Sequence, residues 1–345
     1  MAPPPSDDRT LAELAETEVL ARILPRMSAG TNAQLGPGDD AAVVSAPDGR
    51  FVVTTDMMVH GPDFRLAWST PFDLGWKAAA SNLSDVAAMG ARPTALVVSI
   101  AAPPSTRISL LEGIADGLSA GCGAMAPGCG VVGGDLSTSA TLTLSITAFG
   151  SLDGRAPVLR SGARPGDVVA VAGVLGSAGA GLRLLFDRAR RDGEPDADLA
   201  QRLRARYPDA LGAQLAPVPP IAAGVSAGGR ATAMMDVSDG VVLDARRMAR
   251  ASGVAIDLDP AAVDAAARPL TTIDGVDLDL ARAFVLGGGE DHAMLACFPP
   301  DAALPDGFTD LGRVVAGEPE VRLGGVALTE RMGWDPYSGW DGGAG

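Results

Sequence analysis

The order of apolar and polar positions along the chain predicts helices and strands in alternation. Apolar residues recur at the spacing of one helix face in three segments, residues 11–24, 71–90 and 108–121. Between and after them, short runs rich in Val, Leu, Ile and Thr predict strands at residues 51–56, 94–102, 131–135 and 141–150. The first 150 residues therefore predict a sheet with flanking helices, with the VVGGD run opening into a glycine turn.

A break rich in Gly, Pro and charge follows at residues 151–167, after which the same alternation starts again. A strand, a glycine turn and a helix occupy residues 167–190, and the highly charged residues 190–209 predict a solvated excursion. Four further segments complete a second predicted sheet, at residues 233–240, 254–259, 293–298 and 311–328. We expect a flexible tail (1–10), an N-terminal domain (11–155) and a C-terminal α/β domain (156–345).

Composition limits the class of protein. The 345 residues suit two domains of ordinary size, and a hydrophobic fraction of 47% allows a sizeable core. The net charge of −15 repels nucleic acid and anionic membranes. Three cysteines without CxxC spacing predict no disulfide framework, and we see no signal peptide or membrane helix. We expect a soluble cytoplasmic protein with no nucleic-acid or membrane partner.

Carboxylates recur next to predicted strands and glycine turns. One such turn, GDD at 38–40, would by itself indicate a solvated tip. Six acidic groups of this kind occur along a chain whose single lysine is Lys77, at GDD, TTD, NLSD, GGD, DVSD and GGGED. Carboxylates crowded without basic partners raise one another's pKa or bind divalent cations, and Mg²⁺ prefers oxygen ligands. His60 and His292 are too few and too isolated to indicate zinc.

An acidic chain of this kind could hold a nucleoside triphosphate only through metal cations, while glycine backbone N–H groups approach the phosphates. The sequence contains neither a GxxxxGK[ST] loop nor a protein-kinase signature. The glycine-rich turn at residues 173–185 opens a predicted helix. A phosphate cradle and a packing role are both open for this turn.

Seven segments together resemble a known family: LGPGDDAAVV, VVTTDMMVHGPDF, GWKAAASNLSDVAAMGARP, VVGGDLS, LRSGARPGD, DVSDGVVLD and LGGGEDHAML. In this order they resemble the thiamine-monophosphate kinases, of the superfamily that includes aminoimidazole ribonucleotide synthetase and selenophosphate synthetase. The resemblance runs from about residue 11 to the C-terminus. It implies a two-domain α/β (α+β) fold with mixed sheets and flanking helices, and a homodimer formed through the N-terminal domain.

The resemblance also implies the reaction. ATP and thiamine monophosphate would give ADP and thiamine diphosphate by direct in-line transfer of the γ-phosphate, with several Mg²⁺ ions and no phosphoenzyme. We expect no catalytic side chain, because an acceptor phosphate oxygen is already deprotonated at pH 7. Two other readings are open: another ATP-dependent superfamily member acting on a different phosphorylated small molecule, such as a ring-closing synthetase, and a non-catalytic nucleotide sensor.

The resemblance further implies roles for individual residues. The expected metal ligands are Asp40, Thr54, Thr55, Asp56, Asp85, Asp135, Asp236 and Asp239. The expected ATP contacts are Gly134, Asp135, Arg160 and Ser238. The expected contacts to thiamine monophosphate are Asp63, Glu290, Tyr337 and Trp340.

The chain departs from the family pattern on the substrate side. Asp63 stands where the family has a histidine before phenylalanine, and His60 lies three residues earlier. GGEDYE becomes GGEDHA, which places His292 and Ala293, and the arginine expected after the proline pair at 219–220 is absent. None of these changes removes an expected metal ligand, so they concern the acceptor more than ATP.

Overall fold

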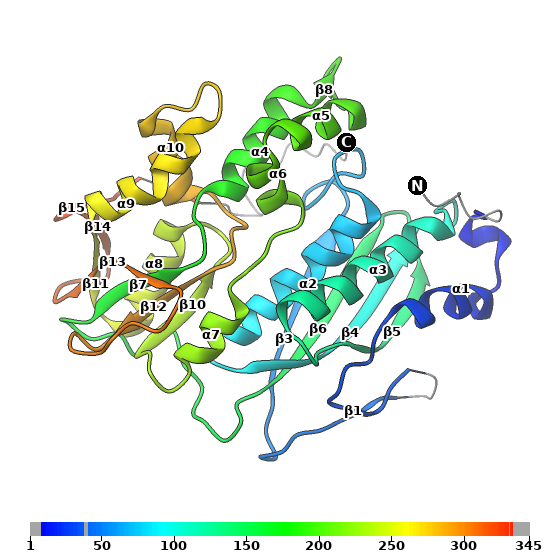
Figure 1. The fold of residues 1–345 in the computed structure, drawn as a ribbon, viewed down its shortest axis with the longest axis horizontal. Helices are drawn as coiled ribbons and strands as arrows, with labels where there is room; N and C mark the ends of the chain where they lie inside the picture. Colours follow the sequence, from blue (N-terminus) through cyan, green and yellow to red (C-terminus); the bar gives the residue numbers. More distant parts are fainter. Residues whose placement is uncertain (1–7, 38–40, 331, 334–345) are drawn as a thin grey trace.

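Two large sheets, each flanked by helices, form the computed structural model, which describes residues 8–37, 41–330 and 332–333 (Figure 1). The first sheet has the strand order β3-β6-β4-β5. Its strands are β3 (Val52–Val59), β4 (Arg92–Ala102), β5 (Val131–Thr138) and β6 (Thr143–Ser151). β6 runs antiparallel to both β3 and β4, whereas β4 and β5 are parallel. The predicted mixed sheet with flanking helices is confirmed.

Two long helices, α2 (Pro71–Ala88) and α3 (Ile108–Met125), lie along one face of this sheet (Figure 1). α2 begins with a capping box, in which Thr70 Oγ1 accepts from the N–H of Asp73 and the Asp73 carboxylate accepts from the N–H of Thr70. Pro71 occupies the first helical turn, where a missing N–H costs nothing. These local features explain why the predicted helix at residues 71–90 is confirmed almost to its ends.

Glycines let α2 and α3 approach until their backbones touch. A Cβ on Gly75 would lie 2.0 Å from the carbonyl oxygen of Ile114, and a Cβ on Gly117 would lie 2.1 Å from that of Phe72. Because no side chain larger than hydrogen fits at either position, the crossing depends on both glycines.

Short elements precede the first sheet. They are η1 (Leu11–Glu13), α1 (Glu16–Ile23), η2 (Leu24–Arg26), and the paired strands β1 (Ala33–Leu35) and β2 (Val43–Val44). The single helix predicted for residues 11–24 is wrong in detail, because Leu14 and Ala15 are extended and divide it.

The second sheet is built from the rest of the chain, with the order β10-β12-β7-β13-β11-β14-β15. Its strands are β7 (Val168–Ala172), β10 (Ala233–Val237), β11 (Ala255–Leu258), β12 (Ala293–Phe298), β13 (Phe308–Val315), β14 (Val321–Leu323) and β15 (Val326–Ala327). Its helices are α4 (Ser177–Arg188), α5 (Ala197–Arg206), α6 (Pro208–Leu215), α7 (Ile221–Ala227), α8 (Val241–Ser252), α9 (Pro260–Ala267), η3 (Arg268–Thr272) and α10 (Leu278–Gly287). The chain passes between the sheets in the segment from β6 to β7, and a domain boundary at residues 155–156 stays a prediction.

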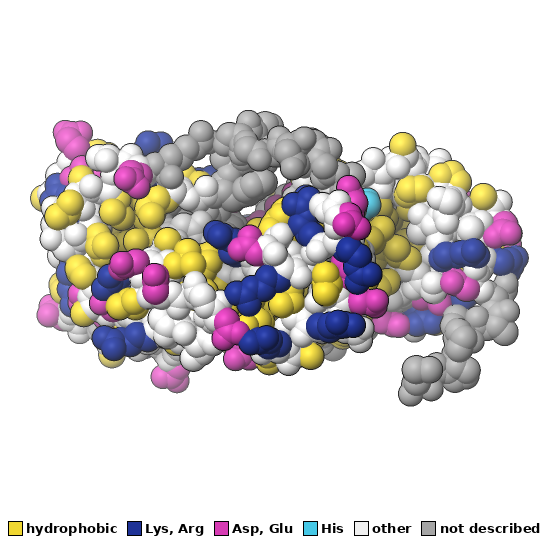
Figure 2. All heavy atoms as spheres, turned by 90° about the horizontal axis from the view of Figure 1, so that it is seen from above, with side chains coloured by type: hydrophobic (Ala, Val, Ile, Leu, Met, Phe, Trp, Pro, Cys, Tyr) yellow, Lys and Arg dark blue, Asp and Glu magenta, His cyan; other side chains and the backbone are white. Residues whose placement is uncertain are grey.

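Most of the charged segment at residues 190–209 is exposed, as expected, but it is folded and contacts the N-terminal domain through Arg204. It forms the hairpin β8 (Arg190–Arg191) and β9 (Glu194–Pro195), followed by α5. Arg204 of α5 makes two hydrogen bonds of 2.7 and 2.9 Å to the buried carboxylate of Asp73 on α2. Seen from above, the molecule carries basic and acidic side chains interspersed over its surface (Figure 2). The charges therefore contribute to an interdomain contact, which the sequence pattern does not reveal.

Two tryptophans add further contacts between the domains. Trp76 Nε1 on α2 donates to the carbonyl oxygen of Pro217 at 2.7 Å, and Trp68 Nε1 donates to that of Ala189 at 3.0 Å. Both bonds join residues before or on α2 to the C-terminal domain, so α2 is shared between the two units. Of the helices in the described ranges, none is long and apolar enough to cross a membrane.

Candidate active site

Four residues expected in the site meet at a cavity between the two domains. Thr54 on β3, Asp85 on α2, Arg160 in the interdomain segment and Asp236 on β10 all line this space of about 460 Å³. The TTD segment was expected to end its strand, but Thr54–Asp56 lie inside β3. The cavity nevertheless collects hydroxyl, carboxylate and guanidinium groups from four distant segments.

The carboxylates near this cavity lie close enough to influence one another. Thr54 Oγ1 donates to Asp85 Oδ2 at 2.8 Å. Burial, together with the charges of Asp236 and Asp56, raises the pKa of Asp85 to about 7, against the opposing effect of that hydrogen bond. Burial also raises the pKa of Asp56. Ionised carboxylates at such buried, closely spaced positions are unfavourable unless a cation is nearby. A divalent metal ion bound between them would neutralise their charge.

Asp236 is buried and held by a polar group on each side. Ser84 Oγ donates to Asp236 Oδ2 at 3.2 Å, and His292 Nδ1 lies 3.2 Å from the same oxygen. Burial disfavours the charged imidazole, but the hydrogen bond and charge of Asp236 leave the pKa of His292 raised. Ser81 Oγ lies 3.2 Å from His292 Nε2. His292, whose role the sequence left open, therefore orients Asp236.

Asp239 and Ser238 lie in the turn between β10 and α8. Arg247 Nη1 donates to Asp239 at 2.6 Å and to the fully buried Asp244 at 2.7 Å. The expectation that these carboxylates lack basic partners is therefore wrong at Asp239. Ser238 accepts the N–H of Glu290 through its carbonyl oxygen at 2.7 Å, which fixes the GGGED loop beside the turn.

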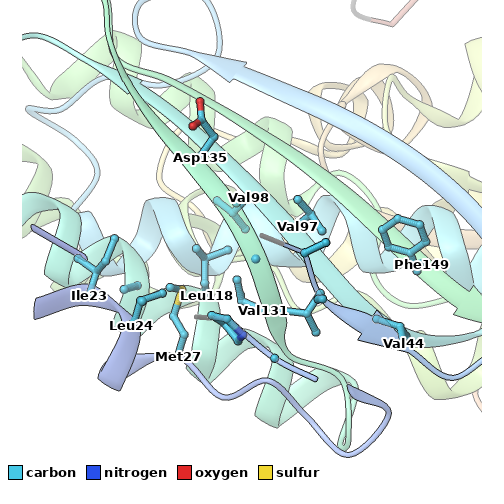
Figure 3. A pocket seen from close by; sticks show the side chains of 18 of the residues that line it. Ile23, Leu24, Met27, Val44, Val97, Val98, Leu118, Val131, Asp135 and Phe149 are labelled. Carbon is cyan, nitrogen blue, oxygen red and sulfur yellow. The ribbon is translucent and has the colours of Figure 1, made fainter. Parts of the chain in front are cut away.

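Gly134 and Asp135 line a second, mostly apolar cavity of about 800 Å³ (Figure 3). The expected glycine turn is wrong, because β5 continues through both residues to Thr138. Residue pairing places Gly134 beside Val98, Val98 beside Ile146, and Ile146 beside Asp56. Gly134 and Asp56 thus stand on opposite edges of the sheet, three strand spacings or about 14 Å apart. The apolar side chains labelled in the cavity include Ile23, Leu24, Met27, Val131 and Phe149.

Glu290 forms an ion pair with the only lysine of the chain. Lys77 Nζ on α2 lies 2.8 Å from Glu290 Oε2, and Gln214 Nε2 on α6 donates to the same oxygen. Burial opposes ionisation of Glu290, but Lys77 lowers its pKa overall. Asp63 accepts the N–H of Val59 at 2.7 Å, and burial raises its pKa.

One face of α2 connects these groups. Lys77, Ser81, Ser84 and Asp85 follow one another at spacings of four, three and one residues, so they form a single stripe along the helix. In order, the first three contact Glu290, His292 and Asp236, and Asp85 faces the interdomain cavity. At 1.5 Å per residue, the stripe is about 12 Å long.

The remaining predicted residues are placed as follows. Thr55 is exposed and donates to the carbonyl oxygen of Ile146 at 2.9 Å, on the face of β3 opposite Thr54. Asp39, Asp40, Tyr337 and Trp340 lie outside the described residues. Within the ranges that the structure describes, no three Asp, Glu, His or Cys side chains converge tightly enough to hold a metal ion by themselves.

The glycine-rich turn before α4 is occupied by a carboxylate of the protein itself. Asp291 accepts the N–H of Gly176 at 2.5 Å and that of Ala178 at 2.9 Å. Gly176 has a φ of 79°, a left-handed conformation that favours glycine. Of the two roles left open, the structure favours packing, because Asp291 satisfies the helix N-terminus where a phosphate would bind.

Three polar residues that contact the expected site residues were not predicted from the sequence: Lys77, Gln214 and Arg247. Lys77 was noticed only as the single lysine, although its place within GWKAAASNLSD could have indicated a role. Gln214 and Arg247 gave no indication, since each lies in a helix with an ordinary mixture of residues.

Comparison with known proteins first defines the class. The family model described as AIR synthase related protein, N-terminal domain, matches residues 38–152, and that of the C-terminal domain matches residues 164–317. The thiamine-monophosphate kinase of Mycobacterium tuberculosis strain H37Rv is 44% identical over 336 residues, covering 96% of this chain and 94% of the relative. That of Corynebacterium glutamicum is 38% identical over 314 residues, covering 89% and 88%.

Solved structures that resemble this chain are described as proteins of the same kind. A crystal structure of thiamine-monophosphate kinase from Stenotrophomonas maltophilia K279a has a TM-score of 0.73 and 32% identity, covering 91% of this chain and 98% of that one. The structure described as AaThiL complexed with AMPPCP and TMP has a TM-score of 0.71 and 30% identity, covering 86% and 90%. The chain belongs to the thiamine-monophosphate kinase family of the AIR synthase related proteins.

Proposed function

We propose that the protein is a thiamine-phosphate kinase, which transfers the γ-phosphate of ATP to thiamine monophosphate and forms thiamine diphosphate and ADP. The observation that carries the proposal is the interdomain cavity, where Thr54, Asp85, Arg160 and Asp236 meet. The relatives' shared name and the neighbour described as complexed with AMPPCP and TMP support the same reaction.

The residues at the cavity fit Mg²⁺. They supply hard oxygen donors, and burial beside Asp236 and Asp56 raises the pKa of Asp85 to about 7, so that a cation would stabilise its ionised form. Mg²⁺ typically uses one or two protein carboxylates together with phosphate and water, so three converging side chains are not required. Asp56, Asp85 and Asp236 would hold it, with Thr54 fixing Asp85. Bound there, Mg²⁺ would neutralise charge between the two phosphate groups.

In this proposal, one cavity binds the adenosine of ATP and the other binds its phosphates. The apolar cavity beside Gly134 and Asp135 suits an adenosine, while Arg160, which is exposed at the interdomain cavity, suits a phosphate. The separation of about 14 Å between the two sheet edges is one that an extended nucleoside triphosphate can span. Ser238 and Asp239 border the same region from the C-terminal domain.

The acceptor fits the stripe on α2. With its phosphate towards Asp85, a molecule lying parallel to the stripe, outside the groups that cover it, would place its other end near the exposed side of Glu290, about 12 Å away. A carboxylate there suits a cationic thiazolium, and Asp63 contributes negative potential nearby. The protein's part in the reaction is to align the two phosphates, because a phosphate monoester oxygen attacks without a general base.

A direct assay tests this function. Purified protein with ATP, Mg²⁺ and thiamine monophosphate is expected to form thiamine diphosphate, followed by chromatography. Thiamine in place of the monophosphate and a sample with EDTA are expected to give no product, because the acceptor must carry a phosphate and the carboxylates need a cation. Turnover confined to other phosphate esters would assign a different acceptor, and ATP binding without turnover would favour a nucleotide sensor.

We also propose that the protein is a homodimer formed through the open face of the first sheet. Apolar side chains on β3 point away from α2, with Val53 54% and Met57 61% exposed. An exposed apolar sheet face of this kind is typical of an interaction surface.

Substituting Met57→Asp is therefore expected to convert a dimer into a monomer of 34.7 kDa in analytical ultracentrifugation, because a charge cannot be buried there without a partner. Val326→Asp is the matched control, since Val326 is 69% exposed on the second sheet. A wild-type monomer, or a Met57→Asp dimer of unchanged stability, would show that this face is not the interface.

A further inference from the structure

The surroundings of Glu290 contain two unfavourable features in one place. Glu290 has a φ of 67°, in the left-handed region that a residue with a side chain rarely adopts. Gln214 is 4% exposed, and its Oε1 is buried without a hydrogen-bond partner among the described residues. A fold gains nothing in stability from either feature, and such features are often retained where they serve function.

The contacts around Glu290 show what these features achieve. Lys77 Nζ and Gln214 Nε2 both donate to Oε2 of Glu290, and neither bond uses Oε1. Lys77 is also fixed by the carbonyl oxygen of Gln214 at 3.0 Å. The orientation of the Gln214 amide follows, because turning it over would bring its oxygen against the ionised carboxylate.

The two residues that hold Glu290 come from different domains. Lys77 lies on α2 and is 5% exposed, whereas Gln214 lies on α6 of the C-terminal domain. The Glu290 side chain is 33% exposed, so part of the carboxylate remains accessible. A carboxylate anchored through one oxygen is positioned in advance and does not have to be ordered when a ligand binds.

We infer that Lys77 and Gln214 are positioning residues that hold Glu290 through Oε2 and leave Oε1 to bind the cationic end of the phosphorylated acceptor. The inference rests on the proposed function and assigns specificity to residues that do not themselves touch the acceptor. Lys77 sets the charge state and place of the carboxylate, and Gln214 sets its direction.

Steady-state kinetics of the full chain test the inference, with thiamine monophosphate and ATP varied in turn. Lys77→Met is expected to raise KM for thiamine monophosphate by about tenfold, the effect of a lost charge-assisted hydrogen bond. KM for ATP is expected to stay within about twofold, because ATP binds at the other end of the site.

Gln214→Met provides an independent variant that removes the unpaired acceptor. It is expected to raise KM for thiamine monophosphate about fivefold, because the bond to Glu290 is lost. Tm is expected to stay the same or increase, because removal of the buried, unpaired Oε1 offsets the loss of that bond. If Gln214 had only a structural role, the variant would lower Tm and leave KM for thiamine monophosphate unchanged.

Trp76→Phe is the matched control, because it removes the interdomain bond to Pro217 without touching Glu290. It is expected to lower Tm and leave KM for thiamine monophosphate unchanged. If the wild-type enzyme turns over thiamine monophosphate but Lys77→Met and Gln214→Met keep its KM, the inference is wrong and the function stands. If the variants raise both KM values equally, the residues only support domain packing. If the wild-type enzyme does not act on thiamine monophosphate, the function and the inference both fall.

Discussion

Asp85→Asn is expected to lower kcat by about 10³-fold while the protein stays folded. Asparagine keeps the shape of the side chain and a partner for Thr54, but it removes the charge that would hold a divalent cation between the phosphates. Because the pKa of Asp85 is raised to about 7 by burial and by neighbouring carboxylates, loss of this charge also relieves repulsion. We therefore expect Tm to be unchanged or higher in the absence of nucleotide.

The measurement is kcat for thiamine diphosphate formation at saturating ATP and Mg²⁺, with thermal unfolding recorded on the same samples. Asp279→Asn is a suitable control, since the Asp279 side chain on α10 is 88% exposed and does not line the cavity. Near wild-type turnover by Asp85→Asn would contradict the assignment of the interdomain cavity as the place of phosphoryl transfer.

Gly117→Val is expected to destabilise the protein by about 3 kcal/mol, the upper part of the range for overpacking. A Cβ at this position would meet the Phe72 carbonyl oxygen at 2.1 Å, so α2 and α3 must move apart. Since α2 carries Asp85 and Lys77, activity is expected to fall together with stability. The free energy of unfolding from urea denaturation measures the effect.

Gly123→Ala, on the same helix, separates this crowding from a general effect of replacing glycine. Nothing lies within 4 Å of a Cβ at Gly123, so alanine is expected to stabilise α3 by about 0.5–1 kcal/mol. Equal stability of Gly117→Val and the wild type would mean that the two helices do not pack as closely as described.

Much of the fold follows from local patterns. The helix at α2 is marked by its capping residues Thr70 and Asp73 and by apolar spacing, and its sequence limits agree with the structure to within two residues. Strands β7, β10, β11 and β12 are equally clear, because each is a short apolar run between charged or glycine-rich segments. The single segment predicted at residues 311–328 is instead three strands, β13 to β15, the first of which begins at Phe308. Patterns that act within a few residues are recoverable from sequence alone.

The C-terminal limit of β5 was missed for a physical reason. Gly133 and Gly134 indicate a turn by composition, yet they lie inside β5, where a Cβ on Gly134 would come within 1.9 Å of the Val98 carbonyl oxygen. The glycine is needed for close approach of the neighbouring strand and not for a turn. Composition does not distinguish these two uses of glycine.

The candidate site could be predicted only in part. The acidic motifs identified Asp85 and Asp236, and the structure places both at one cavity. The basic partners were missed, because Lys77 and Glu290 lie 213 residues apart and meet only when the domains pack. Asp239 was taken to lack such a partner, although Arg247 lies two turns along the following helix.

The two tryptophans at the domain contact give the molecule an intrinsic optical probe. The sequence contains four tryptophans, and the two within the described ranges, Trp68 and Trp76, both donate to carbonyl oxygens of the C-terminal domain. Separation of the domains would hydrate both indoles before either sheet loses its strands. The emission of these two residues therefore follows the separation of the two domains, whereas far-ultraviolet circular dichroism follows the sheets and helices.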